Sequence, residues 1–252
     1  MGYYSGEELS IAVVSSISIA IFVFGLYIQF RKYGVGKADG TSKVGAIGFV
    51  RLILSLILKN IKKDPKRFVK LFVFGILFQR MIFRRSKFRW VMHLMIFWGW
   101  ILPFIFFIVI VFFWMVDWIY GRMYGVEPPI YLTPNFWMEE LETPTNIAEY
   151  MLLGGISVAV VRRLISKAVR EMSDFHDYFL TFSLFFVVIM GLIAELMGKG
   201  VFGELSNYAP QFTLFYEITA LLIFVALVPF TKYFHMIAVP LVILALGDDR
   251  DV

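Results

Sequence analysis

The stretch WVMHLMIFWGWILPFIFFIVIVFFWMVDW, from Trp90 to Trp118, decides the fold class of this protein. It has no Asp, Glu, Lys or Arg before Asp117, and it exceeds the roughly 20 residues that a helix needs to cross a hydrocarbon core of about 30 Å. In the whole chain of 252 residues, 60% are hydrophobic, whereas soluble domains average about half. The sequence therefore predicts an all-α integral membrane protein.

Five apolar blocks are long enough to be transmembrane helices, and we expect them to form a single membrane domain over residues 1–252. The blocks cover about residues 9–30, 90–118, 146–161, 178–197 and 212–246. The third block is the shortest, and the fifth is interrupted by Pro229, Lys232 and Pro240. An odd number of spans places the two termini on opposite sides of the membrane.

The charge of the connecting segments predicts the orientation. Residues 31–89, between the first two blocks, contain 16 of the 24 lysines and arginines, whereas the next connection is acidic. Basic segments stay in the cytoplasm, so the N-terminus is expected outside and the C-terminus inside. Within this basic insert, residues 49–58 and 68–83 are apolar patches interrupted by charges. They are typical of amphipathic helices that lie on the membrane surface or under a soluble partner.

Histidine is scarce, and two of the three histidines stand at similar depths in apolar blocks. His93 follows the cytoplasmic start of the second block, and His235 precedes the cytoplasmic end of the fifth. Two imidazoles at matched depth can bind one haem iron from both sides, which favours electron transfer because no coordination position stays open. Arg89 and Lys232 each lie about one turn from a histidine and are candidate partners of the haem propionates.

The alternative interpretation is that these histidines are interfacial hydrogen-bonding residues. A single histidine near a helix end more often has that role, but polar groups inside membrane spans are expensive and tend to be functional. His176, in a charged run before the fourth block, is interpreted as a solvated residue. The chain has no cysteine, which excludes a cysteine-ligated iron–sulfur cluster and a thiol-linked haem.

Four segments resemble a known family, and together they extend over most of the chain. They are Phe78-Gln79-Arg80, Arg89-Trp90-Val91-Met92-His93, Val160-Val161-Arg162-Arg163-Leu164, and Pro229-Phe230-Thr231-Lys232-Tyr233-Phe234-His235 through Pro240 and Leu241. With them the sequence resembles the membrane cytochrome b subunits of the nitrate reductase gamma type. The closer resemblance is to the E subunit of membrane-bound heterodisulfide reductase.

The resemblance implies a five-helix, haem b-containing subunit that oxidises a lipid-soluble carrier, menaquinol or reduced methanophenazine. The electrons would pass to a cytoplasmic iron–sulfur protein resembling the D subunit of heterodisulfide reductase. His93 and His235 match the two ligands of the haem nearer the cytoplasm. Family members with two haems carry two further histidines, where this sequence has Pro103 and Tyr216 or Glu217. We therefore expect one haem b.

Glu195 and Glu217 stand near the expected outer ends of the fourth and fifth blocks. Either carboxylate is a candidate proton acceptor if the carrier is oxidised near that face. The alternative is that both side chains simply reach the lipid headgroups. Two other functions compete with the cytochrome: a haem-free membrane anchor of a redox complex, and a small transporter. A transporter is expected to have discontinuous helices and an internal repeat, and the sequence makes neither evident.

Overall fold

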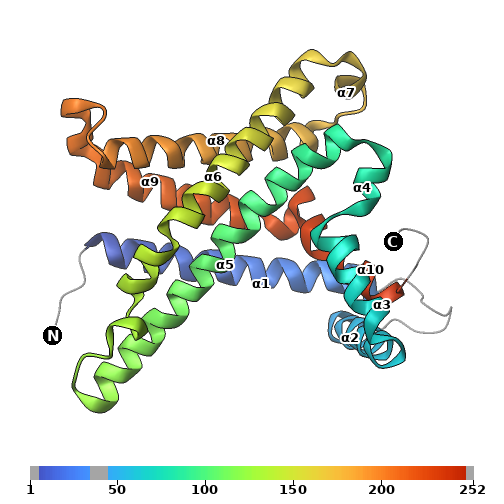
Figure 1. Ribbon diagram of the computed structural model, residues 1–252, viewed down its shortest axis with the longest axis horizontal. Coiled ribbons are helices and arrows are strands. Elements are labelled where there is room, and N and C mark those ends of the chain that lie inside the picture. Colours follow the sequence, from blue (N-terminus) through green and yellow to red (C-terminus); the bar gives the residue numbers. More distant parts are fainter. Residues whose placement is uncertain (1–5, 35–44, 248–252) are drawn as a thin grey trace. The chain divides into compact units, whose positions relative to one another are not determined.

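The computed structural model describes residues 6–34 and 45–247, and all regular structure in this part of the chain is helical (Figure 1). Helices account for 91% of it, and it contains no strand. Four segments are long and apolar enough to cross a membrane: Val13–Gly34, Lys87–Tyr124, Phe175–Gly198 and Gly203–Ala226. The predicted all-α membrane class is therefore confirmed.

The chain divides into two compact units. The first unit combines Met1–Arg85 with Ala168–Val252, as far as these ranges are described, and the second unit is Ser86–Lys167. The second unit contains the helices α5 (Lys87–Tyr124) and α6 (Pro134–Ile165), which are joined through the short 3-10 helix η2 (Ile130–Leu132). The two long helices pack along each other.

Small residues allow α5 and α6 to approach closely. A Cβ atom added at Gly99 of α5 would lie 2.6 Å from the backbone nitrogen of Leu152 and 2.7 Å from the carbonyl oxygen of Ala148. A Cβ atom at Gly155 of α6 would similarly lie 2.9 Å from the side chain of Ile96. In membranes, helix association depends on such close packing because lipid removes the hydrophobic driving force.

The predicted third block, 146–161, is only the apolar half of a longer helix. α6 begins twelve residues before it, at Pro134, because proline suits the first turn of a helix. The first half of α6 carries Glu139, Glu140 and Glu142. The structure identifies four candidate spans, and α6 is not among them, although the sequence predicts five.

In the first unit, three long helical segments lie side by side. α1 (Gly6–Gly34) packs against α9 (Ala209–Leu221) and the following π-helical turn η4 (Leu222–Ala226). α8 (Phe175–Gly198) packs on the other side of α9, as Figure 1 shows. α8 is preceded by α7 (Lys167–Glu171) and connects to α9 through the 3-10 helix η3 (Gly203–Tyr208).

The predicted fifth block is a broken helix. After η4 the chain forms two single 3-10 turns, η5 (Val228–Phe230) and η6 (Lys232–Phe234), before α10 (His235–Leu246) begins. Pro229 lies in η5, where its missing N–H prevents a continuous α-helix. The side-chain Nε2 of Gln29 on α1 donates to the Pro229 carbonyl oxygen at 2.5 Å. The discontinuous helix that the sequence did not make evident is thus present.

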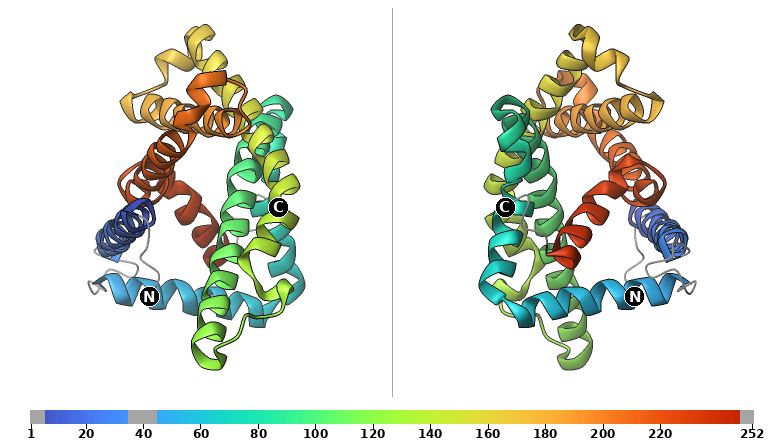
Figure 2. Two further views of the ribbon diagram at one scale, coloured as in Figure 1. Left: turned by 90° about the vertical axis from the view of Figure 1, so that its left-hand side faces the viewer. Right: turned by 90° about the vertical axis from the view of Figure 1, so that its right-hand side faces the viewer.

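The basic insert is helical where it is described; residues 35–44 of the predicted insert 31–89 lie outside the described residues. The patch 49–58 lies in α2 (Gly45–Lys63), which packs on α1 and α10 (Figure 2). Asn60 of α2 donates to the carbonyl oxygens of Leu244 and Ala245 at 2.9 and 2.8 Å. It therefore pairs carbonyls that the end of α10 would otherwise leave without partners.

The sequence predicts one amphipathic helix over the patch 68–83, but the structure divides this patch. It divides into the end of α3 (Pro65–Lys70), the π-helix η1 (Leu71–Leu77) and the start of α4 (Arg80–Arg85). Gln79 lies between η1 and α4. Its backbone φ is 48°, in the left-handed region that residues other than glycine seldom adopt. This residue belongs to one of the four segments that carry the family resemblance.

Candidate functional site

His93 lies in the second turn of α5, close to where that helix starts. Ser86 caps the helix: its hydroxyl oxygen accepts from the backbone N–H of Arg89 at 3.4 Å. His93 is half-buried, and it lies only six residues before Gly99, where α5 approaches the backbone of α6. The histidine is therefore carried by a closely packed pair of helices rather than by a loop.

His235 is the first residue of α10, directly after the η6 turn, and it is exposed within the chain. Its ring Nδ1 is hydrogen-bonded to the carbonyl oxygen of Lys232. Because a carbonyl oxygen only accepts, Nδ1 must be the protonated nitrogen, and in the neutral ring Nε2 keeps a free lone pair. Metal-binding histidines commonly make such a second hydrogen bond through the other ring nitrogen.

The two histidines belong to different units, so their pairing on one iron remains a prediction. Within the described residues, no group of three or more His, Cys, Asp or Glu side chains is arranged to bind a metal ion. Haem is compatible with that finding, because a bis-imidazole site needs only one histidine from each of two helices. Arg89, the predicted propionate partner on α5, is exposed.

The other predicted propionate partner, Lys232, already has acceptors for all three of its N–H groups. Its Nζ lies 3.0 and 2.9 Å from the two carboxylate oxygens of Asp174 and 2.8 Å from one oxygen of Asp177. The Lys232 ammonium lowers the pKa of the Asp174 carboxyl, which therefore stays charged at neutral pH. Arg89 is the better candidate for a propionate.

His176 lies between these two aspartates, in the first turn of α8. It is exposed, and its ring meets Phe175 edge to face at 5.9 Å between centroids. Its exposure agrees with the interpretation as a solvated residue.

The two predicted proton acceptors have different surroundings. Glu195 forms an ion pair with Lys199, the residue that directly follows α8. Glu217 is half-buried in the middle of α9. The two candidates therefore differ in that Glu195 has a cationic partner at the end of its helix.

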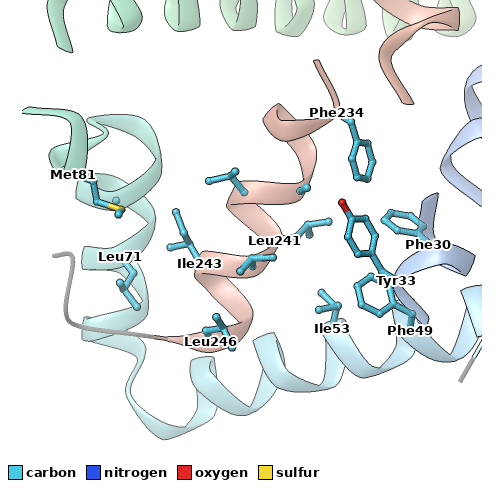
Figure 3. Close-up of a pocket in the computed structure, with 14 residues that line it drawn as sticks. Phe30, Tyr33, Phe49, Ile53, Leu71, Met81, Phe234, Leu241, Ile243 and Leu246 are labelled. Atoms are coloured by element: carbon cyan, nitrogen blue, oxygen red, sulfur yellow. The ribbon is translucent and has the colours of Figure 1, made fainter. Parts of the chain in front are cut away.

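An apolar cavity of about 380 Å³ surrounds part of α10 (Figure 3). Figure 3 shows Phe30 and Tyr33 of α1 on one side of α10, and Leu71 and Met81 on the other. Tyr33 stacks on Phe234 at 6.1 Å between ring centroids, with 16° between the ring planes. Among the residues that line the cavity, Tyr33 alone has a polar side chain. An occupant must therefore be largely apolar.

Sequence reasoning did not identify Asp174, Asp177, Gln29 or the cavity. The spacing Asp174-x-x-Asp177 was a usable signal, because it predicts a reciprocal helix cap. The structure contains that cap: each carboxylate accepts from the other residue's backbone N–H, at 2.9 and 3.2 Å. Its link to Lys232 was not visible, since 55 and 58 residues separate the partners.

Comparisons with known proteins identify the family of this chain. The family model of the dihydromethanophenazine:CoB–CoM heterodisulfide reductase E subunit matches residues 69–243. Proteins of that description from Methanosarcina barkeri and Methanosarcina thermophila are 36% and 35% identical to this chain, each over 97% of both sequences. The corresponding protein from Methanosarcina mazei is 35% identical over 97% of this chain and 98% of its own length.

No solved structure matches the chain. The family match covers the Phe78-Gln79-Arg80 segment, both histidines of the predicted pair and most of the broken helix. The protein therefore belongs to the E-subunit family of dihydromethanophenazine:CoB–CoM heterodisulfide reductase, and it is a multi-pass protein of the cell membrane.

Proposed function

We propose that this protein is the haem b-containing membrane subunit of a heterodisulfide reductase complex. It would transfer electrons from a lipid-soluble carrier to a cytoplasmic iron–sulfur protein resembling the D subunit of that enzyme. The observation that carries the proposal is the state of His235, whose Nδ1 is hydrogen-bonded to the Lys232 carbonyl and whose Nε2 is left to bind a metal.

The residue types of this chain suit the proposed low-spin haem. His235 and His93 would bind the iron through their imidazoles, and Arg89 would pair with a propionate. Bound haem b supplies a one-electron acceptor and donor at this position. One haem per chain is proposed, since Pro103 and Tyr216 or Glu217 stand where two-haem relatives have further histidines.

The names of the relatives contain dihydromethanophenazine, which favours reduced methanophenazine over menaquinol as the carrier. We place the carrier in the cavity around α10. Its apolar walls suit a lipid-soluble molecule, and the stacked rings of Tyr33 and Phe234 suit a flat ring system. Phe234 is adjacent to His235 in sequence, which keeps the carrier near the proposed ligand. Glu195 and Glu217 do not line this cavity.

The proposed membrane arrangement retains five spans in one domain of residues 1–252, with the N-terminus outside and the C-terminus in the cytoplasm. The apolar half of α6 would be the third span, supported by its close packing on α5. The broken helix from α9 to α10 would be the fifth. The basic helices α2 to α4 would then face the cytoplasm, where their lysines and arginines are available to a partner protein or to anionic lipids.

An absorption spectrum of the purified protein tests the proposal. Reduction with dithionite should produce the sharp α-band of a low-spin b-type haem, and a pyridine haemochrome assay should give about one haem per chain. A ratio near two would contradict the single haem. A spectrum without a haem band would leave the haem-free anchor.

The broken helix alone does not favour a transporter, since the family match covers it and no internal repeat accompanies it.

A further inference from the structure

The turn that carries His235 is attached to α8 by two consecutive side chains. Lys232 reaches the first turn of α8, where its Nζ contacts Asp174 and Asp177 at 2.8 to 3.0 Å. The hydroxyl of Tyr233 donates to the Leu180 carbonyl oxygen at 2.9 Å and lies 3.1 Å from the Ser183 hydroxyl. The turn therefore contacts α8 at two places, the first turn of that helix and the Leu180 carbonyl.

The carboxylates that hold Lys232 are themselves fixed. Asp174 and Asp177 accept from each other's backbone N–H groups, in a reciprocal cap at the start of α8. This cap limits the rotamers of both side chains, so they present their oxygens to Lys232 in one arrangement. The ion pairs are partly exposed, with side-chain exposures of 43% for Lys232 and 58% for Asp174. Such pairs contribute little to overall stability.

Lys232 connects this cluster to the histidine through its own backbone. The Lys232 carbonyl oxygen accepts from Nδ1 of His235, three residues further on. The Lys232 carbonyl oxygen also accepts from the backbone N–H of His235, so the backbone turn and the Lys232 side chain together hold this residue in place. The carbonyl in turn sets the rotation of the imidazole ring and the direction in which Nε2 points.

We propose that Asp174 and Asp177 are positioning residues for the His235 ligand, acting through Lys232. The inference rests on the proposed function, because it assumes that His235 binds the haem iron. Both aspartates contact Lys232 and would act on the histidine only through it. Their effect would be to set the angle of the His235 imidazole plane, on which the electronic structure of a bound bis-histidine haem would depend.

The test uses the purified full-length haem protein and its low-spin ferric EPR spectrum, whose g values report the relative orientation of the two imidazole planes. Lys232→Met removes the link, and the double variant Asp174→Asn with Asp177→Asn removes its acceptor charges. Asparagine still caps a helix, so α8 should be retained. We expect haem content close to wild type and displaced g values in both variants. Lys232→Arg keeps the positive charge that pairs with the two aspartates, and its g values should be closer to those of the wild type than the g values of Lys232→Met.

The two variants also separate positioning from a simple charge effect. Lys232→Met removes a positive charge and the double variant removes two negative charges, so charge alone would shift the midpoint potential in opposite directions. It would leave the ring angle, and therefore the g values, unchanged. As a matched control, Lys199→Met breaks the Lys199–Glu195 pair at the far end of the same helix and should leave the g values unchanged.

Wild-type g values in both Lys232→Met and the double variant would overturn the inference. If the double variant does not fold, Asp174→Asn alone must give a smaller displacement in the same direction, because the contact with Asp177 remains. If the g values of Asp174→Asn are those of the wild type, the inference is also overturned. Failure of the proposed function is distinguishable, since the wild-type protein would then contain no haem.

Discussion

At the scale of single residues, the proposed role of His235 depends on which of its ring nitrogens is available. The Lys232 carbonyl accepts the hydrogen bond from Nδ1, so Nε2 is the nitrogen that would bind a metal. His176 has no comparable bond among its described contacts and lies on the exposed start of α8. Sequence reasoning selected His93 and His235 by their place in apolar blocks, and their pairing on one iron stays a prediction.

His93→Ala and His235→Ala should each abolish the haem spectrum, because a single remaining imidazole cannot hold a six-coordinate low-spin iron. The measurement is the reduced-minus-oxidised difference spectrum of each purified variant. His176→Ala is the control and should keep the full α-band. Haem loss in the His176 variant, with retention in either of the others, would show that the wrong histidines were paired.

At the scale of helices, glycine allows the backbones of two helices to approach each other closely. α5 contains two informative positions: Gly99 faces the backbone of α6, whereas a Cβ at Gly121 would meet nothing within 4 Å. Sequence reasoning identified the helix that contains both but did not distinguish them, because each glycine lies in an apolar or aromatic context. Only the packed partner separates a glycine that is needed from one that is not.

Gly99→Ala should destabilise the protein by about 1–3 kcal/mol, since the added methyl group would have to push α6 away. Gly121→Ala is the matched control on the same helix and should be neutral or stabilising by up to about 1 kcal/mol. Thermal unfolding in detergent, followed by circular dichroism, compares the two. Equal midpoints would mean that α5 and α6 do not pack at Gly99.

The cavity around α10 allows a similar comparison on a second element. A Cβ at Gly75 of η1 would lie 3.7 Å from Ile243, an ordinary contact, so Gly75→Ala should be tolerated. Gly75→Leu should fill part of the cavity and reduce the rate at which a reduced hydroxyphenazine donates electrons to the haem. The haem spectrum itself should not change. A normal rate in Gly75→Leu with a slow rate in Glu217→Gln would instead place carrier oxidation at Glu217.

At the scale of the whole molecule, the number of membrane crossings depends on α6. The charge asymmetry of the connecting segments predicts a cytoplasmic insert and an external N-terminus. The structure identifies four candidate spans, and the apolar half of α6 would supply the fifth. Because the sequence has no cysteine, single cysteines can be introduced without any background reaction.

Ile130→Cys and Val201→Cys should react with a membrane-impermeant maleimide in intact cells, because both residues lie in the predicted external connections. Both side chains are well exposed, at 72% and 63%. Met172→Cys, exposed at 78% in a predicted cytoplasmic connection, should react only after the membrane is permeabilised. Labelling of the cysteine at 130 without labelling at 201 would contradict the proposed order of spans.

The sequence by itself determined the membrane class, the all-helical fold and the residues that carry the family resemblance. These properties follow from local quantities: the length of apolar runs, the charge of the connections and the order of residues along short segments. No contact between distant parts of the chain is needed to recognise them.

Only the tertiary structure decided how the fifth block is broken and how His235 is held. The Pro229 carbonyl is paired by Gln29, which lies 200 residues earlier, and Lys232 is held by carboxylates more than 50 residues away. A carbonyl or an ammonium needs a partner, but its residue type does not specify which one. That choice depends on which helices the fold brings together, and no local pattern in the sequence records it.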